Sequence, residues 1–188
     1  MTPYGRTAQE SVQRALKAFR VVLITGPRQA GKTTLARLLG EGRPRRAFVS
    51  LDDLTALSSA KSDPQGFIRN LPLPVTIDEI QRAPDLLLPI KRQVDERRRP
   101  GDFLLTGSAD PMAVQSVTES LAGRMAMIPL RPLTWAERLK RPGWNPLARV
   151  LKCRTAKAVA AAFPASPYGQ TRLDREVLMG GFPEPALH

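Results

Sequence analysis

The stretch VVLITGPRQAGKTT, residues 21–34, constrains the fold of this chain more than any other. Its first five residues form an apolar run, which indicates a short buried β-strand. The run continues into the pattern G-x-x-x-x-G-K-[ST], whose fixed positions are Gly26, Gly31, Lys32 and Thr33. A helical pattern, TLARLL, follows at once. A strand, a glycine loop and a helix in this order predict a phosphate-binding P-loop.

The composition of this loop suits the binding of phosphate groups. Glycines let the backbone bend so that successive N–H groups point into one concavity, and the positive end of the following helix adds to the field. Lys32 would reach the β- and γ-phosphates of a nucleotide, and the Thr33 hydroxyl would coordinate Mg²⁺. The alternative is a glycine-containing surface turn beside an ordinary lysine, and the flanking strand and helix weigh against it. The residues expected around the phosphates are Gly26, Pro27, Arg28, Gln29, Ala30, Gly31, Lys32, Thr33 and Thr34.

A second strand-like run, LPVTIDEIQ at residues 73–81, ends in two acidic residues, Asp78 and Glu79. After a P-loop, such a run is a Walker B candidate, in which Asp78 would hold Mg²⁺ and Glu79 would polarise the attacking water. The alternative is an acidic helix cap after a buried strand, which is common. The P-loop upstream favours the magnesium-binding interpretation.

Two further polar positions are candidates for catalysis. The apolar run at residues 103–106 ends in Thr106, Gly107 and Ser108, so either Ser108 or Thr106 would sense the γ-phosphate. The alternative is an ordinary turn. Arg124 stands just before the next strand-like run, AMIPL. It is either a finger for the ATP of a neighbouring copy, which would imply a homo-oligomer, or a surface charge.

Strand-like and helical segments alternate along the chain, which predicts an α/β fold with a mostly parallel sheet. We expect the three-layer sandwich of a P-loop NTPase, with about five strands in the sheet. In such sheets the ligand binds beyond the carboxyl ends of the strands. Gly26, Asp78 and Ser108 all stand at such ends, and three separate motifs therefore converge on one site.

The texture of the sequence changes after Pro129, where prolines become frequent. We expect a P-loop ATPase domain over residues 1–134 and a small, basic, mainly helical and truncated extension over residues 135–188. Within the extension, residues 146–163 carry an alanine-rich helical pattern, and Leu173 to Leu178 suggest a last short helix.

The formal net charge of +12 attracts polyanions. Basic residues cluster at 43–46, 91–99 and 149–157. A basic surface of this kind fits nucleic acid, an acidic protein partner, or no specific partner at all. Few aromatic residues interleave the clusters, which weakens the case for a surface that stacks single-stranded bases.

Other features bound the compartment. The single cysteine, Cys153, excludes an intrachain disulfide framework and suits a reducing cytosol. No window reaches 18 apolar residues, and the N-terminus lacks the apolar core of a secretory signal. We therefore expect a cytoplasmic protein without a membrane partner.

Together the motifs resemble those of a known family. GPRQAGKTT, VSLDD, VTIDEIQ, LLTGSA, LAGR, PLTWAE and GGFPE are similar to the motifs of prokaryotic AAA+-superfamily ATPases that carry a C-terminal domain of unknown function. The resemblance spans residues 4–186, and the first, third and last of these motifs together are specific. In that family GGFPEP leads into a C-terminal domain that has been likened to nuclease folds. The resemblance therefore implies a truncated chain that lacks any activity of that domain.

The resemblance implies the same roles for the residues already named. Nucleotide would bind to residues 26–34, Asp78 and Glu79 would hold magnesium and activate water, and Arg124 would be the arginine of the site. The resemblance also implies a role for Asp52 and Asp53 that chemistry alone does not explain. The opening segment Tyr4-Gly5-Arg6 would lie against the adenine.

We expect ATP and Mg²⁺ binding with slow ATP hydrolysis, used as a switch or motor. The candidate catalytic residues are Lys32, Glu79, Ser108 and Arg124, and the candidate metal ligands are Thr33 and Asp78. The alternative is a nucleotide-gated DNA- or protein-binding module without turnover. A GTPase is disfavoured because no N-K-x-D occurs, and a small-molecule kinase because paired acids suit attack by water.

Overall fold

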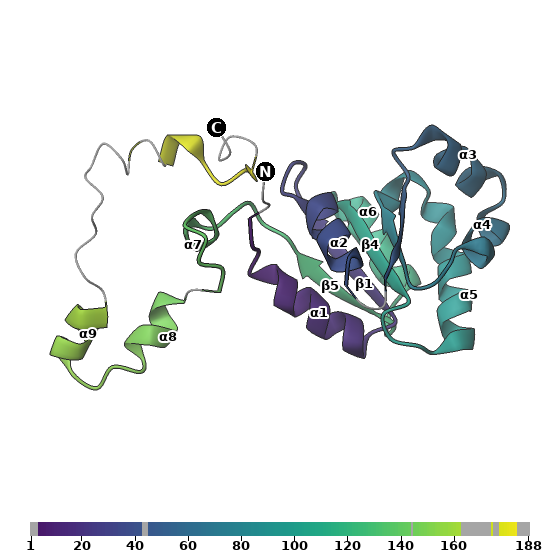
Figure 1. The fold of residues 1–188 in the computed structure, drawn as a ribbon. Helices are drawn as coiled ribbons and strands as arrows, with labels where there is room; N and C mark the ends of the chain where they lie inside the picture. The colour runs from purple at the N-terminus through teal and green to yellow at the C-terminus, as the bar shows by residue number, and fades with distance from the viewer. Residues whose placement is uncertain (1–3, 43–44, 144, 163–173, 175–176, 184–188) are drawn as a thin grey trace. The chain divides into compact units, whose positions relative to one another are not determined.

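The structure is a computed structural model that describes residues 4–42, 45–143, 145–162, 174 and 177–183 (Figure 1). The chain divides into two compact units. The first contains Thr7–Pro132, and the second contains Thr2–Arg6 and Leu133–His188. The P-loop, Asp78, Glu79, Thr106 and Ser108 all belong to the first unit.

Five strands form one sheet in the order β2-β3-β4-β1-β5, and all neighbours are parallel. The strands are β1 (Val21–Gly26), β2 (Ala47–Ser50), β3 (Val75–Asp78), β4 (Phe103–Ser108) and β5 (Met125–Pro129). The P-loop strand β1 lies between β4 and β5, with Gly26 opposite Ser108. Because the strands are parallel, their carboxyl ends form one edge of the sheet and their amino ends the other. We call these the carboxyl edge and the amino edge. The predicted parallel α/β sheet is confirmed.

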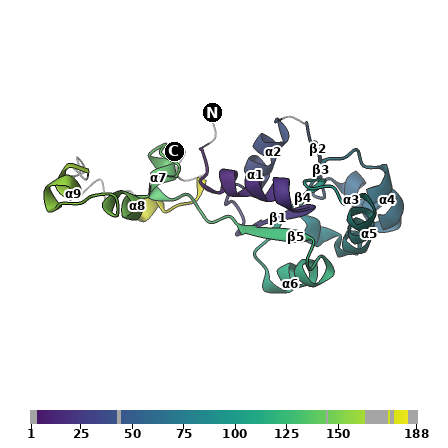
Figure 2. The ribbon, with the colours of Figure 1, turned by 90° about the horizontal axis from the view of Figure 1, so that it is seen from below.

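Helices cover both faces of the sheet and give three layers (Figure 2). One face carries α1 (Ala8–Ala18) and α2 (Lys32–Gly40). The other face carries α3 (Leu54–Ser62), α4 (Pro64–Asn70), α5 (Leu87–Arg97) and α6 (Pro111–Ser120). Two 3-10 turns, η1 (Ile80–Arg82) and η2 (Pro84–Leu86), lie between β3 and α5.

Strand β1 shows why the sheet needs helices on both sides. Val21 and Leu23 belong to the core under α3 to α6, whereas Val22 and Ile24 belong to the core under α1 and α2. All four side chains are buried. Successive side chains of a strand point to opposite faces, so a continuous apolar run is what a strand buried on both faces requires.

The second unit contains the short helices α7 (Trp135–Arg138), α8 (Pro146–Val150) and α9 (Ala156–Ala162). A capping box between Thr134 and Glu137 starts α7. The Glu137 carboxylate also pairs with Arg6 at 3.4 Å, and both side chains are buried. Among the described residues of the chain, no helix is long and apolar enough to cross a membrane.

The helical pattern expected over residues 146–163 forms two helices, α8 and α9, within the described range. The two helices are separate because the Thr155 hydroxyl accepts from the N–H of Ala158 at 3.1 Å and so starts a new helix. Helix α9 has no buried residue, so no packing holds a longer helix together. Residues 177–179 are helical, whereas residues 163, 173 and 184–188 lie outside the described residues.

Candidate active site

The P-loop sits at the carboxyl edge, between β1 and α2. Gln29 and Gly31 both adopt left-handed backbone conformations, with φ of 62° and 88°. For a residue with a Cβ such as Gln29, this conformation costs roughly 1–2 kcal/mol. Alternating right- and left-handed residues turn successive N–H groups toward one side, which makes a concavity for an anion. Strain of this kind is typical of ligand-binding loops.

Gly26 is required by close packing rather than by its own φ. A Cβ at this position would lie 2.2 Å from the carbonyl oxygen of Leu130. The segment after β5 is held there by a hydrogen bond from the Leu130 N–H to the carbonyl of Thr25, at 2.6 Å. The first glycine of the motif therefore lets the exit of β5 pass directly beside the entry to the loop.

Lys32 opens α2 and points back into the loop. Its ammonium donates to the carbonyl oxygens of Gly26 at 3.1 Å and Pro27 at 2.9 Å. The residue is 5% exposed, so its charge is directed into the loop rather than into solvent. The sequence-predicted lysine is thus already inside the concavity that would hold the phosphates.

Asp78 is the centre of the polar network at the carboxyl edge. It is 2% exposed and accepts hydrogen bonds from three hydroxyl groups. The distances are 3.0 and 3.1 Å from Thr33 Oγ1, 2.6 Å from Thr106 Oγ1 and 3.4 Å from Ser50 Oγ. Strands β2, β3 and β4 and helix α2 each supply one member of this network. Ser50 was not predicted as a site residue, although it ends β2 and lies within the VSLDD motif.

Glu79 follows Asp78 in a left-handed conformation, with φ of 60°. Its N–H donates to Thr106 Oγ1 at 3.0 Å. Thr106 therefore bridges the two acidic residues, donating to Asp78 and accepting from Glu79. The unusual backbone at Glu79 turns the chain from β3 into η1 and places a second carboxylate at the same edge.

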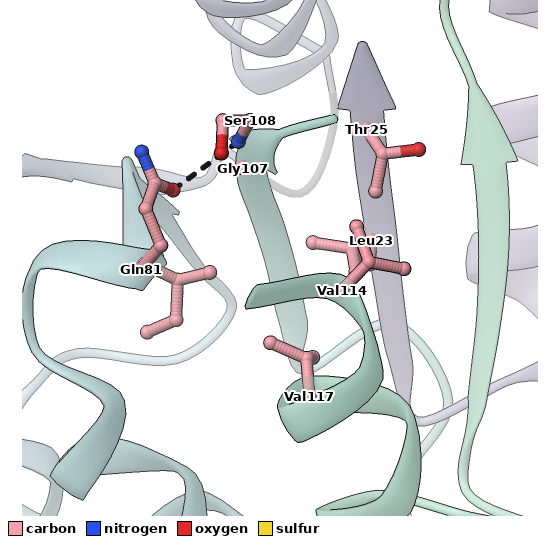
Figure 3. A pocket seen from close by; sticks show the side chains of 8 residues that line it. Leu23, Thr25, Gln81, Gly107, Ser108, Val114 and Val117 are labelled. Atoms are coloured by element: carbon pink, nitrogen blue, oxygen red, sulfur yellow. Dashed lines mark hydrogen bonds between the residues drawn. The ribbon is translucent and has the colours of Figure 1, made fainter. Parts of the chain in front are cut away.

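Gln81 is the functional candidate that the sequence did not reveal. Its side-chain amide donates to the Glu79 carboxylate, and its carbonyl oxygen accepts from the Ser108 N–H at 3.3 Å. Figure 3 shows the Gln81 side chain directed at the end of β4. A Cβ on Gly107 would lie 3.3 Å from the same oxygen, so glycine leaves room for this contact. Gln81 therefore links Glu79 to the residue proposed as sensor.

The two sensor candidates occupy different positions. Thr106 is fully buried and both of its hydrogen bonds go to the acidic pair. Ser108 is partly exposed, lies opposite Gly26 at the end of β4, and accepts from the N–H of Asp110 at 3.4 Å. Ser108 is thus the candidate beside the P-loop, whereas Thr106 supports the carboxylates.

The structure does not bring Arg124 to the phosphate site of its own chain. Arg124 precedes β5, and its carbonyl accepts from the Val21 N–H at the amino edge, at 3.2 Å. Its guanidinium makes two hydrogen bonds to Asp95, at 2.7 and 2.9 Å. These bonds hold the pKa of Asp95 below its ordinary value. A role as a finger would therefore concern the nucleotide of a neighbouring copy.

Asp52 and Asp53 have separate structural roles. The Asp53 carboxylate caps α3 by accepting from the Ala56 N–H at 2.9 Å. Asp52 forms an ion pair with Arg82, which follows Gln81 in η1. The pair of aspartates after β2 thus fixes the helix that follows and the turn beside the acidic pair.

The segment proposed to contact adenine belongs to the second unit, where Arg6 is paired with Glu137.

The residues at this edge fit a magnesium ion. Mg²⁺ prefers hard oxygen ligands and is typically bound by one or two protein side chains with phosphate and water. The hydroxyl of Thr33 and the carboxylate of Asp78 are already in contact, and Asp78 has no basic partner among the described residues. No group of three or more carboxylate, histidine or cysteine ligands that could hold a metal occurs in the described part of the chain.

A family model described as an AAA domain matches residues 18–139. This chain belongs to the AAA family. The match covers the sheet, the P-loop and both acidic residues, so the resemblance seen in the motifs is confirmed as a prokaryotic AAA+ P-loop ATPase domain.

Two curated mycobacterial relatives are similar to this AAA domain. The uncharacterized proteins Rv2008c of Mycobacterium tuberculosis and Mb2031c of Mycobacterium bovis are each 44% identical over 129 residues. The match takes in 69% of this chain and 29% of each relative. The chain thus aligns with less than a third of the length of these relatives.

Solved structures share the fold at low sequence identity. AMPPCP-bound DnaA from Aquifex aeolicus aligns with a TM-score of 0.58 and 16% identity, over 99% of this chain and 61% of DnaA. A DNA replication initiation factor aligns with a TM-score of 0.54 and 14% identity, over 96% of this chain and 56% of that chain. At such identities the likeness establishes the fold and nothing more.

Proposed function

We propose that this AAA domain binds ATP with Mg²⁺ at the carboxyl edge and hydrolyses it slowly to ADP and phosphate. The observation that carries the proposal is the contact between Thr33 of the P-loop and Asp78 of β3. Two motifs far apart in the sequence meet at 3.0 Å, in the arrangement that a magnesium–nucleotide site needs. The AMPPCP bound to DnaA, which has a similar fold, supports a nucleotide as the ligand.

In the proposed binding step, the phosphates enter the concavity formed by residues 26–34. The Lys32 ammonium exchanges its two carbonyl acceptors for phosphate oxygens, and the N–H groups of the loop and of the start of α2 donate to the anion. Thr33 and Asp78 would hold Mg²⁺, which would supply charge neutralisation at the phosphates.

In the proposed hydrolysis step, Glu79 orients a water molecule and accepts its proton. The water oxygen forms a bond to the γ-phosphorus while the bond from that phosphorus to the β–γ bridging oxygen breaks, and ADP leaves. Ser108 contacts the γ-phosphate from the end of β4. Gln81 holds the Glu79 carboxylate in position through its side-chain amide.

A nucleotide-gated binding module without turnover is the second candidate. It is favoured by one observation: the Glu79 carboxylate is engaged by Gln81, which competes with a water molecule for the same oxygen. If ATP does not release this contact, the domain would bind nucleotide and act through the bound state alone.

Steady-state hydrolysis and ATP binding, measured on the same variants, separate these functions. Glu79→Gln should retain ATP binding and lose about 10²-fold or more in turnover, since it can no longer accept the proton. Glu119→Gln is the matched control, because Glu119 is an exposed carboxylate on α6. If the wild-type chain binds ATP but does not hydrolyse it, the result would favour the binding module. Unchanged turnover in Glu79→Gln would remove Glu79 from the reaction.

A further inference from the structure

The residues that precede the five strands form a continuous row along the amino edge. In sheet order they are Arg46, Pro74, Asp102, Arg20 and Arg124. Each of the last four accepts, through its carbonyl oxygen, a hydrogen bond from the first residue of the neighbouring strand, at 2.9 to 3.2 Å. Three of the five are arginines, so the parallel sheet itself brings arginines from separate parts of the sequence to one edge.

Helix ends add further cations to this edge. Helices α1, α2 and α5 all end here, because each leads into the start of a strand. The described basic residues of the edge are Lys17, Arg20, Arg45, Arg46, Arg97, Arg98, Arg99 and Arg124. The acidic residues in the same segments are Glu41, Asp95, Glu96 and Asp102. Cations therefore outnumber carboxylates by two to one.

The buried or half-buried carboxylates of the edge are already occupied. Asp95 is bound by Arg124 and, at 3.4 Å, by Arg20. Asp102 is buried and bound by Arg97 at 3.1 Å. In contrast, Lys17, Arg45 and Arg99 are exposed and form no ion pair with any described residue. The positive potential that remains is thus directed outward.

A cleft of about 480 Å³ opens among these residues. We call it the amino-edge cleft. It lies between the ends of α1 and α2 and the starts of β2, β3 and β4, and its lining includes Gln13, Lys17, Gly42, Arg46, Pro74 and Arg99. Two of its cations, Lys17 and Arg99, are exposed and come from separate segments of the chain, the end of α1 and the loop before β4. Such a cleft can contact an anion through more than one segment.

Arg46 is a cation whose solvation is incomplete. Its guanidinium donates to the carbonyl oxygens of Val75 at 3.0 Å and Gly101 at 2.7 Å, and it forms no ion pair within the described chain. Burial lowers its pKa to about 10, although the nearby charge of Asp102 acts in the opposite direction. An anion in the cleft would stabilise the charged form, because it would replace the solvation that burial removes.

We propose that the amino-edge cleft binds the phosphodiester backbone of a nucleic acid. Cations outnumber carboxylates by two to one in the described segments of this edge, which suits a polyanion better than a single small anion. Phe19 is the only exposed aromatic side chain in the described segments of this edge, so phosphate contacts dominate over base stacking. Contacts of this kind carry no sequence information, and binding is accordingly independent of sequence.

The amino-edge cleft is separate from the proposed nucleotide site. The P-loop lies at the carboxyl edge, about 17 Å away along β1 at the usual rise per residue of a strand. Nucleic-acid binding can therefore be tested without ATP and does not depend on the proposed ATPase activity. Helix α2 begins in the P-loop and ends beside the cleft, so the two sites share one element.

The test is fluorescence anisotropy with a labelled DNA duplex of 20 base pairs, titrated with the whole chain at several salt concentrations. The double variant Lys17→Glu/Arg99→Glu should weaken binding at least tenfold and lower the slope of log K against log salt by about two, one for each lost phosphate contact. The matched control is Lys61→Glu/Arg69→Glu, which changes the net charge equally at exposed residues of α3 and α4. It should bind within about twofold of the wild type.

Each outcome decides the proposal. Equal weakening by both double variants would show a diffuse charge effect and overturn the assignment to the cleft. Undetectable binding of the duplex at low salt would also overturn the proposal. It would be overturned in the same way if inorganic pyrophosphate bound but the duplex did not. Lys32→Ala should lose ATP and keep the duplex, which distinguishes failure of the nucleotide site from failure of the cleft. A duplex of unrelated sequence should bind equally well.

Discussion

At the scale of single residues, the candidate site depends on a few close contacts between individual atoms. Gly26 lies where a side chain would meet the Leu130 carbonyl, Thr106 bridges two acidic residues, and Gln81 joins Glu79 to the end of β4. These contacts are all within the first unit. Small changes at these positions should therefore have effects that can be separated from loss of the fold.

Gly26→Ala should destabilise the domain by about 1–3 kcal/mol, because the new Cβ would displace backbone rather than a flexible side chain. Chemical denaturation measures the change in the free energy of unfolding. The control is Gly42→Ala, whose Cβ would lie 3.6 Å from its nearest neighbour, the carbonyl of Leu39. Equal stability of the two variants would contradict the close approach at Gly26.

Gln81→Ala should reduce turnover with little change in ATP affinity, because Gln81 donates to the carboxylate of Glu79, the proposed general base. A fall of roughly tenfold in kcat is expected if orientation of the carboxylate is its role. Gln81→Glu places a like charge beside Glu79 and should be worse, with a pH–rate profile shifted upward because the two acids share a site. A change confined to KM would contradict this role.

At the scale of elements, the strands were predictable and their mutual placement was not. Runs such as residues 21–25 and 75–78 are apolar and end in polar residues, so both the strand and its functional end can be identified locally. The strand order β2-β3-β4-β1-β5 depends on packing between distant segments, and it decides which basic residues meet at the amino edge.

Other features of these elements that the sequence did not predict have local causes. The contact of Gln81 depends on the left-handed turn at Glu79, which no propensity for an acidic residue predicts. The alanine pattern of residues 146–163 indicates helix but contains no apolar stripe that would fix its length. The roles of Asp52 and Asp53 differ because only one of them faces the first turn of α3.

Asp53→Ala should lower the free energy of unfolding by about 1 kcal/mol through loss of the α3 cap. Asp52→Ala should cost less, roughly 0.5 kcal/mol, since its ion pair with Arg82 is exposed to solvent. Urea denaturation of both variants measures the difference. A larger loss in Asp52→Ala would show that the turn at η1, and not the helix cap, is the more important contact.

At the scale of the whole molecule, the two edges of the sheet carry different groups of polar and charged residues. The carboxyl edge contains the P-loop, the acidic pair and Ser108, whereas the amino edge contains an excess of cations, of which Lys17, Arg45 and Arg99 form no ion pair with a described residue.

Variants of Arg124 test whether one copy of the chain contributes a residue to the ATP site of a neighbouring copy. Because its guanidinium is held by Asp95, we expect Arg124→Ala and Asp95→Ala to lower the melting temperature similarly, with little further loss in the double variant. ATP turnover per molecule should stay unchanged in both variants at every protein concentration. A loss of turnover in Arg124→Ala alone, growing as concentration rises, would instead identify Arg124 as a finger for a neighbour's ATP.

The most direct test of the account is calorimetric titration of the chain with MgATP, in the wild type and in Lys32→Ala. The account predicts one site in the wild type and no detectable binding in the variant, because the Lys32 ammonium is the cation inside the P-loop. Matching melting curves of the free proteins would show that the variant is folded. Equal affinity for ATP in the two proteins would contradict the assignment of the carboxyl edge as the nucleotide site.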